Sequence, residues 1–222
     1  VIFLSPKGKS EEISNDDLKW FESRGFTVLA PDMLGVGELA HSNYNGDSFI
    51  NSKSYSVWYL SILIGRSIVG IRAVDVVRLV NMLRKDQQIK EVYGMARRTM
   101  CAPLLYAAAF DKSIKRICLI NPLSSYRSFV MNRFYDPHFL YSTVADALKV
   151  YDLPDLEASL APRKLMMINI VNGQDKPVDN EINNEDSSVI ESSYQNSMAS
   201  RQLNLISCEK ENIQNCFSTW IK

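Results

Sequence analysis

Apolar runs of strand length alternate along this chain with longer stretches of helical period, and this alternation most constrains the fold. The runs lie at residues 1–4, 26–30, 89–94, 114–120, 165–171 and 203–207. The longest helical stretch follows residue 57, breaks between Gly65 and Gly70, and ends near Arg84. This order predicts an α/β protein, a three-layer α/β/α sandwich with a mostly parallel sheet.

Length and charge narrow the class of protein. The chain has 222 residues, with 25 Lys and Arg against 25 Asp and Glu. One domain over residues 1–222 is therefore expected, without the positive field that a nucleic acid or an anionic membrane surface would attract. The most apolar stretch, residues 57–83, is interrupted by charged side chains and cannot supply the roughly 20 apolar residues of a membrane helix.

The four cysteines contain no Cys-x-x-Cys pair, which argues against common zinc and thioredoxin-like sites. Cys208 and Cys216 are the one pair close enough in sequence for us to consider a disulfide, and the alternative is that both are free, buried thiols. Residues 178–200 are rich in Asn, Ser, Glu and Asp, so they form either a poorly packed surface helix or a loop.

The chain starts at Val1, directly in an apolar run. We therefore expect it to be an excerpt of a longer protein, in which other domains of the parent are partners. No signal peptide can be recognised at such a start, so the sequence does not indicate a localisation.

Several segments together resemble the α/β-hydrolases, and more narrowly the secreted acetylxylan-esterase-like hydrolases. The segments are Ser5 to Lys9, Pro31 to Glu38, Val57 to Tyr59 with Gly65 to Gly70, Asn121 to Arg127 and Tyr151 to Leu156. The resemblance implies a sheet that lacks the family's first strands, a carbohydrate-related esterase activity, and a periplasmic or secreted location. It also implies an oxyanion-type loop at Ser5 and Gly8.

A hydrolase of this fold carries its nucleophile on a tight turn between a strand and a helix, within Gly-x-Ser-x-Gly. The matching segment here is Gly94-Met95-Ala96-Arg97-Arg98, which places an alanine at the nucleophile position. Thr99 and Cys101 follow closely, but Cys101 is expected on the inward face of the next helix.

The other two members of a Ser-His-Asp triad are also not recognisable. The acid position falls on Asn172, with Asp175 as the possible replacement, although an aspartate there also suits a turn. The base should follow residue 207, where the chain reads Cys208 and Glu209 without a histidine. The chain's two histidines, His41 and His138, lie elsewhere and are expected to serve surface or packing roles.

No metal or cofactor is expected. The sequence has no His-Glu-x-x-His motif, no calcium loop and no phosphate-binding or dinucleotide-binding glycine pattern.

Three hypotheses for function follow. The first is a hydrolase-like domain of the carbohydrate-esterase type that has lost triad catalysis and acts as a binding or structural module. The second is an active carboxylester hydrolase with a rearranged site, which would use Ser5, Ser67 or Cys101 with His41 or His138.

The third hypothesis is a cleft that binds a carbohydrate or a small acidic ligand. Arg97, Arg98, Lys7 and Lys9 would place positive charge over the ends of the strands, where a carboxylate or an acidic sugar could bind. The alternative is that these four side chains simply face solvent.

Overall fold

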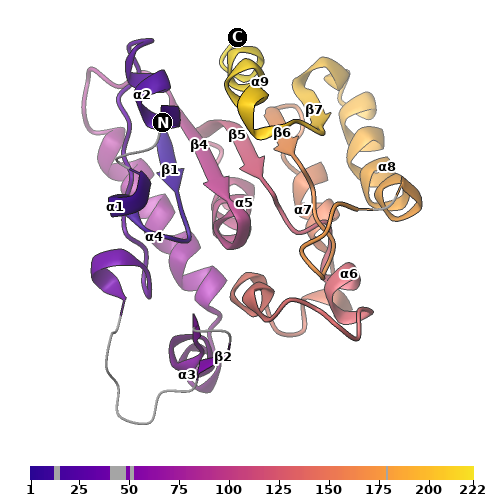
Figure 1. The fold of residues 1–222 in the computed structure, drawn as a ribbon. Coiled ribbons are helices and arrows are strands. Elements are labelled where there is room, and N and C mark those ends of the chain that lie inside the picture. Colours follow the sequence, from indigo (N-terminus) through magenta and orange to yellow (C-terminus); the bar gives the residue numbers. More distant parts are fainter. Residues whose placement is uncertain (13–15, 41–48, 51–52, 179) are drawn as a thin grey trace.

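The computed structural model describes residues 1–12, 16–40, 49–50, 53–178 and 180–222. Its central feature is a five-stranded parallel sheet in the order β1-β4-β5-β6-β7 (Figure 1). The strands are β1 (Ile2–Leu4), β4 (Val92–Arg97), β5 (Ile114–Ile120), β6 (Lys164–Ile168) and β7 (Leu203–Ile206). The predicted α/β class is confirmed.

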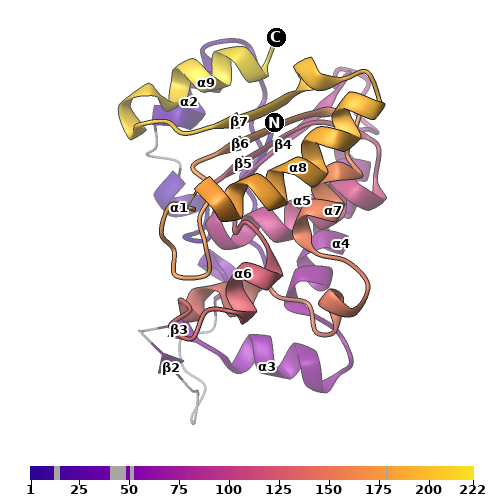
Figure 2. The same cartoon turned by 90° about the vertical axis from the view of Figure 1, so that its right-hand side faces the viewer.

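Helices cover both faces of the sheet, which makes the three layers (Figure 2). One face carries α4 (Ile68–Leu83), α5 (Cys101–Phe110), α7 (Leu153–Ala158) and α8 (Asn180–Asn196), and the other carries α2 (Asp16–Glu22) and α9 (Ile213–Trp220). The smaller elements are α1 (Lys9–Glu12), β2 (Phe49–Ile50), β3 (Lys53–Ser54), α3 (Ser56–Leu63) and α6 (Tyr126–Val130). No helix among the described residues is long and apolar enough to span a bilayer.

Each strand feeds two hydrophobic cores because successive side chains point to opposite faces of a sheet. In β5, Ile117 and Leu119 pack under α4 and α5, whereas Cys118 and Ile120 pack under α2 and α9. The buried stretches of the central strands, such as residues 117–120 of β5, are therefore apolar on both faces, and the charged residues of these strands lie toward the strand ends.

The strand predicted at residues 26–30 is reduced to a single bridge. Leu29 accepts a hydrogen bond from the Phe3 N–H and donates one to the Val1 carbonyl, both at 2.9 Å. The neighbouring β1 has only three residues, and Pro31 lacks an N–H, so the ladder does not extend.

The strand predicted at residues 89–94 starts and ends three residues later. Gly94 pairs with Ile2 and Ile117 in the middle of β4, so it does not end the strand. A Cβ on Gly94 would lie 2.6 Å from Leu104 Cδ1. This glycine therefore allows α5 to pack closely on the sheet, and the chain turns only after Arg97.

Two predictions about helices are settled by capping and packing. The break between α3 and α4 is confirmed, and α4 starts where the Ser67 hydroxyl accepts the Gly70 N–H at 2.9 Å. Of the two alternatives for residues 178–200, the structure has the helix, α8. It buries Ile190 and Tyr194 against the core below α7.

Candidate functional site

The turn between β4 and α5 lies at the carboxyl ends of the strands, where open parallel sheets bind their ligands. Arg98 follows the last residue of β4 and has φ 51°, the left-handed conformation that side chains adopt only when their surroundings enforce it. A 3-10 turn then leads into α5. This is the strand-turn-helix arrangement of a hydrolase nucleophile turn, with an arginine at its apex.

The turn at Arg98 therefore lies two residues after Ala96. Ala96, predicted at the nucleophile position, is fully buried inside β4, where it pairs with Leu4 and Leu119. The reason for this difference is that Gly94 serves helix packing rather than the turn.

The loop after β6 brings one of its two candidate acids to this turn. Asp175 forms an ion pair with Arg98. Asn172 instead folds its own loop, because its Oδ1 accepts the N–H groups of Gln174 at 2.9 Å and Lys176 at 3.2 Å. Of the two candidate residues, Asp175 is the one that contacts the Arg98 turn.

The loop after β7 holds Cys208 where a hydrolase base would follow. Asn169 clamps this residue from both sides: its Oδ1 accepts the Cys208 N–H at 2.8 Å, and its Nδ2 donates to the Cys208 carbonyl at 2.7 Å. Cys208 and its neighbour Cys216 of α9 are free thiols, and they donate to the carbonyls of Glu209 at 3.1 Å and Asn212 at 3.8 Å. Burial and the nearby Cys208 raise the pKa of Cys216 to about 11.

One histidine does reach the site. His138 lies in the 3-10 helix η3 (Pro137–Ser142), and its Nδ1 is 2.8 Å from Asp136 Oδ1. It lines the same pocket as Arg98 and Thr99. The sequence reasoning expected a surface or packing role because residue 138 falls outside the usual order of triad residues. His41 lies outside the described residues.

The pocket has a volume of about 280 Å³. Its wall combines the loop after β1, the Arg98 turn, η3 and α4, with apolar contributions from Pro6, Val36, Met100 and Tyr141. Positive charge comes from Lys7, Arg98 and the buried Arg72. No carboxylate of the described residues lines it.

Two of the four cations predicted to bind a ligand are held away from this pocket. Arg97 points to the opposite face of the sheet, where it pairs with Asp17 of α2. Lys9 Nζ is 2.8 Å from Glu38 Oε2, and its backbone N–H donates to Asp32 Oδ1 at 2.7 Å. Neither side chain lines the pocket, so Lys7 and Arg98 remain as the predicted cations that do.

The loop predicted to resemble an oxyanion loop is shaped by its own side chains. Ser5 is buried, and its Oγ accepts the Lys7 N–H at 3.2 Å. Gly8 has φ 85°, and a Cβ there would lie 2.8 Å from Asp32 Oδ1. The glycine thus lets Asp32 hold the loop beside the pocket.

The other nucleophiles considered from sequence are poorly suited to attack. Cys101 is fully buried, and burial raises the pKa of its thiol, so it stays protonated. The Ser67 hydroxyl caps α4. For metals, no three His, Cys, Asp or Glu side chains among the described residues come together as ligands.

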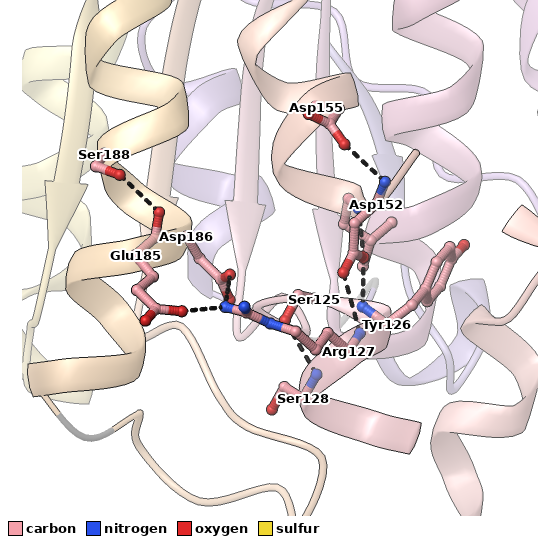
Figure 3. Close-up of polar contacts among 10 residues, drawn as sticks. Ser125, Tyr126, Arg127, Ser128, Asp152, Asp155, Glu185, Asp186 and Ser188 are labelled. Atoms are coloured by element: carbon pink, nitrogen blue, oxygen red, sulfur yellow. Dashed lines mark hydrogen bonds and ion pairs between the residues drawn. The ribbon is translucent and has the colours of Figure 1, made fainter. Parts of the chain in front are cut away.

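A polar cluster lies where α6, α7 and α8 meet (Figure 3). Asp152, at the start of α7, accepts the N–H groups of Tyr126 at 2.5 Å and Arg127 at 3.0 Å, the first turn of α6. Arg127 in turn pairs with Glu185 and Asp186 of α8. The cluster ties α6, α7 and α8 together.

Comparison with known proteins gives matches to solved structures only. No protein-family model matches the chain, and no curated protein is significantly similar in sequence. A structure described as a "putative acetyl xylan esterase" from Bacteroides fragilis matches with a TM-score of 0.68 and 17% identity. That match covers 94% of this chain and 58% of the other, so the chain spans less than two thirds of that protein.

Two further solved structures of esterases also match the fold of this chain. An acetyl xylan esterase from Paenibacillus sp. R4 has a TM-score of 0.62 and 12% identity, over 99% of this chain and 74% of the other. An esterase from Pyrococcus furiosus has a TM-score of 0.52 and 16% identity, over 99% of this chain and 77% of the other. The chain has the α/β-hydrolase fold. Its likeness is to the esterases of that fold, as the sequence resemblance implied.

Sequence reasoning did not single out Arg72 and Tyr141, and it considered His138 only as the base of a rearranged site. Arg72 is hidden in a long helix, and its side chain is only 1% exposed. A charged residue on an otherwise apolar helix face was the available signal. His138 and Tyr141 share η3, whose position above the sheet depends on contacts between distant segments.

Proposed function

We propose that this domain has lost the triad hydrolysis of the esterases it resembles in fold, and that it acts as a non-catalytic binding module. The observation that carries the proposal is the Arg98–Asp175 ion pair at the nucleophile turn. A guanidinium is always protonated at neutral pH and has no lone pair to attack a carbonyl.

The same ion pair also engages Asp175, the candidate acid of a triad. In a working triad the carboxylate orients and stabilises a histidine. Here Asp175 is engaged by Arg98, and the one described histidine of the pocket takes Asp136 as its partner instead. The bound ligand in this proposal is a carbohydrate or a small acid.

The test measures hydrolysis of p-nitrophenyl acetate and labelling by a fluorophosphonate probe. We expect neither above the level of a heat-inactivated sample. Turnover or labelling that disappears in Thr99→Ala, Ser5→Ala or Cys101→Ala would instead establish an active esterase with a rearranged site. Lys19→Ala, on the exposed surface of α2, serves as the control variant.

A further inference from the structure

The pocket beside Arg98 contains a buried positive charge for which the described part of the chain supplies no anion. Arg72 is 1% exposed and lies in the middle of α4. Its Nε and Nη2 both donate to the Leu34 carbonyl, at 3.0 and 2.7 Å, and its guanidinium lies 5.2 Å from the centre of the Tyr141 ring. No carboxylate of the described residues pairs with it.

Burying a guanidinium without an anion is costly. Burial lowers the pKa of Arg72 to about 10, so the side chain is still protonated at neutral pH. Nε and Nη2 are used in the bonds to Leu34, whereas Nη1 has no partner among the described residues. Arg72 also lines the pocket. An anion in the pocket would supply both the missing charge and a hydrogen-bond acceptor.

The rest of the wall adds to this charge without opposing it. Lys7 lines the pocket from the loop after β1. Arg98 is largely neutralised by Asp175, so the net attraction depends mainly on Arg72. Because no described carboxylate lines the pocket, an anionic ligand meets no like charge on its wall.

Two further features restrict the body of the ligand. Pro6, Val36, Met100 and the Tyr141 ring form an apolar side to the pocket, against which a ring can pack. The contact of His138 Nδ1 with Asp136 leaves Nε2 as the ring nitrogen for a ligand hydroxyl. The volume of about 280 Å³ is at the lower end for ligand pockets, so the body is small.

We infer that this pocket binds a small hydroxylated carboxylate, about the size of one acidic sugar, with its carboxylate at Arg72, on the wall that Lys7 also lines. The inference rests on the proposed function, because it takes the pocket to hold a ligand without cleaving it. It adds the ligand class and names Arg72, which the sequence did not indicate, as the main anchor.

The experiment is isothermal titration calorimetry of the full chain with three probes: glucuronate, glucose and acetate. We expect glucuronate to bind, more weakly as salt is raised, and glucose not to bind detectably. Acetate should bind more weakly than glucuronate because it has no ring to meet the apolar side. Glucose binding as tight as glucuronate binding, or no binding of either carboxylate, would overturn the inference.

Matched variants locate the site. Lys7→Ala should weaken glucuronate binding at least about tenfold. Lys9→Ala removes the same charge from the same loop outside the pocket and should leave binding unchanged. Equal losses in both variants would overturn the placement. Arg72→Lys keeps the charge but loses the planar guanidinium, and should also weaken binding if its circular dichroism and melting temperature match those of the wild type.

The outcome is separable from that of the proposed function. Ester turnover would refute the loss of catalysis, whatever the binding result. Absence of both turnover and carboxylate binding would leave the loss of catalysis standing and refute the ligand class alone.

Discussion

The buried carboxyl group of Glu157 predicts an unusual dependence of stability on pH. Glu157 lies in α7 at 1% exposure, and neither of its oxygens has a hydrogen-bond partner among the described residues. Burial, with the nearby charges of Asp186 and Asp152, raises its pKa well above the ordinary value of 4.5. In the folded protein it therefore holds a proton that the unfolded chain releases.

The sign and size of the effect follow from proton linkage. Because the folded pKa is raised, the stabilising contribution is fully present below pH 4.5 and is lost as pH rises toward the folded value. Each pH unit in that window lowers the free energy of unfolding by about 1.4 kcal/mol, the change that linkage gives for one proton released on unfolding. Glu157→Gln removes the titration and should therefore be more stable than the wild type at neutral pH.

The assay is urea unfolding of the wild type and of Glu157→Gln at pH values from about 4 to about 8, in steps of about one pH unit. The difference between the two proteins should begin to change near pH 4.5 and approach about 1.4 kcal/mol per unit from roughly one pH unit above that value. Glu191→Gln, which removes an exposed carboxylate from α8, should run parallel to the wild type. A constant difference between wild type and Glu157→Gln would refute the reasoning.

Three further predictions concern the framework of the site. Gly173→Ala should cost about 1–3 kcal/mol in urea unfolding, because its Cβ would lie 2.6 Å from the Ser128 carbonyl oxygen, and an unchanged midpoint would contradict this packing. Asp152→Ala should cost about 2 kcal/mol, because the carboxylate caps both α6 and α7, whereas a loss below about 0.5 kcal/mol would show that water replaces it. Oxidised glutathione should join Cys208 and Cys216, each losing a proton and the pair giving two electrons to the oxidant. Closing this loop of about nine residues should add roughly 2.5 kcal/mol, and peptide mapping that finds both thiols free would exclude the bond.

The sequence by itself determined the class of fold and most of its elements. The segment at residues 114–120 became β5 with the same limits, because its five apolar residues are buried between the layers on the two faces of the sheet, while Lys115 and Arg116 lie near its start. Strand limits were misplaced where a glycine could serve either a turn or the close packing of a helix. Gly94 was interpreted as part of a turn, but Leu104 packs against it in mid-strand.

The candidate site depended far more on tertiary structure. The sequence showed arginines in the segment that the resemblance matches to the nucleophile turn. It also showed that no histidine follows residue 207, where the resemblance implies the triad base. Only the folded structure decided that Arg98 is at the turn and meets Asp175, and that Arg97 faces away toward Asp17. Adjacent residues differ in this way because the direction of a side chain at a strand end is set by the local backbone angles, while its partner comes from a distant segment.

Arg72 and His138 show the same division. Local pattern predicts helix and loop from the residues around them, because propensity and periodicity act over a few neighbours. Their meeting in one pocket requires α4 and η3 to pack over the ends of β1 and β4, which involves residues more than 60 positions apart. The sequence therefore determined which chemical groups are present, and only tertiary packing decided which of them face each other.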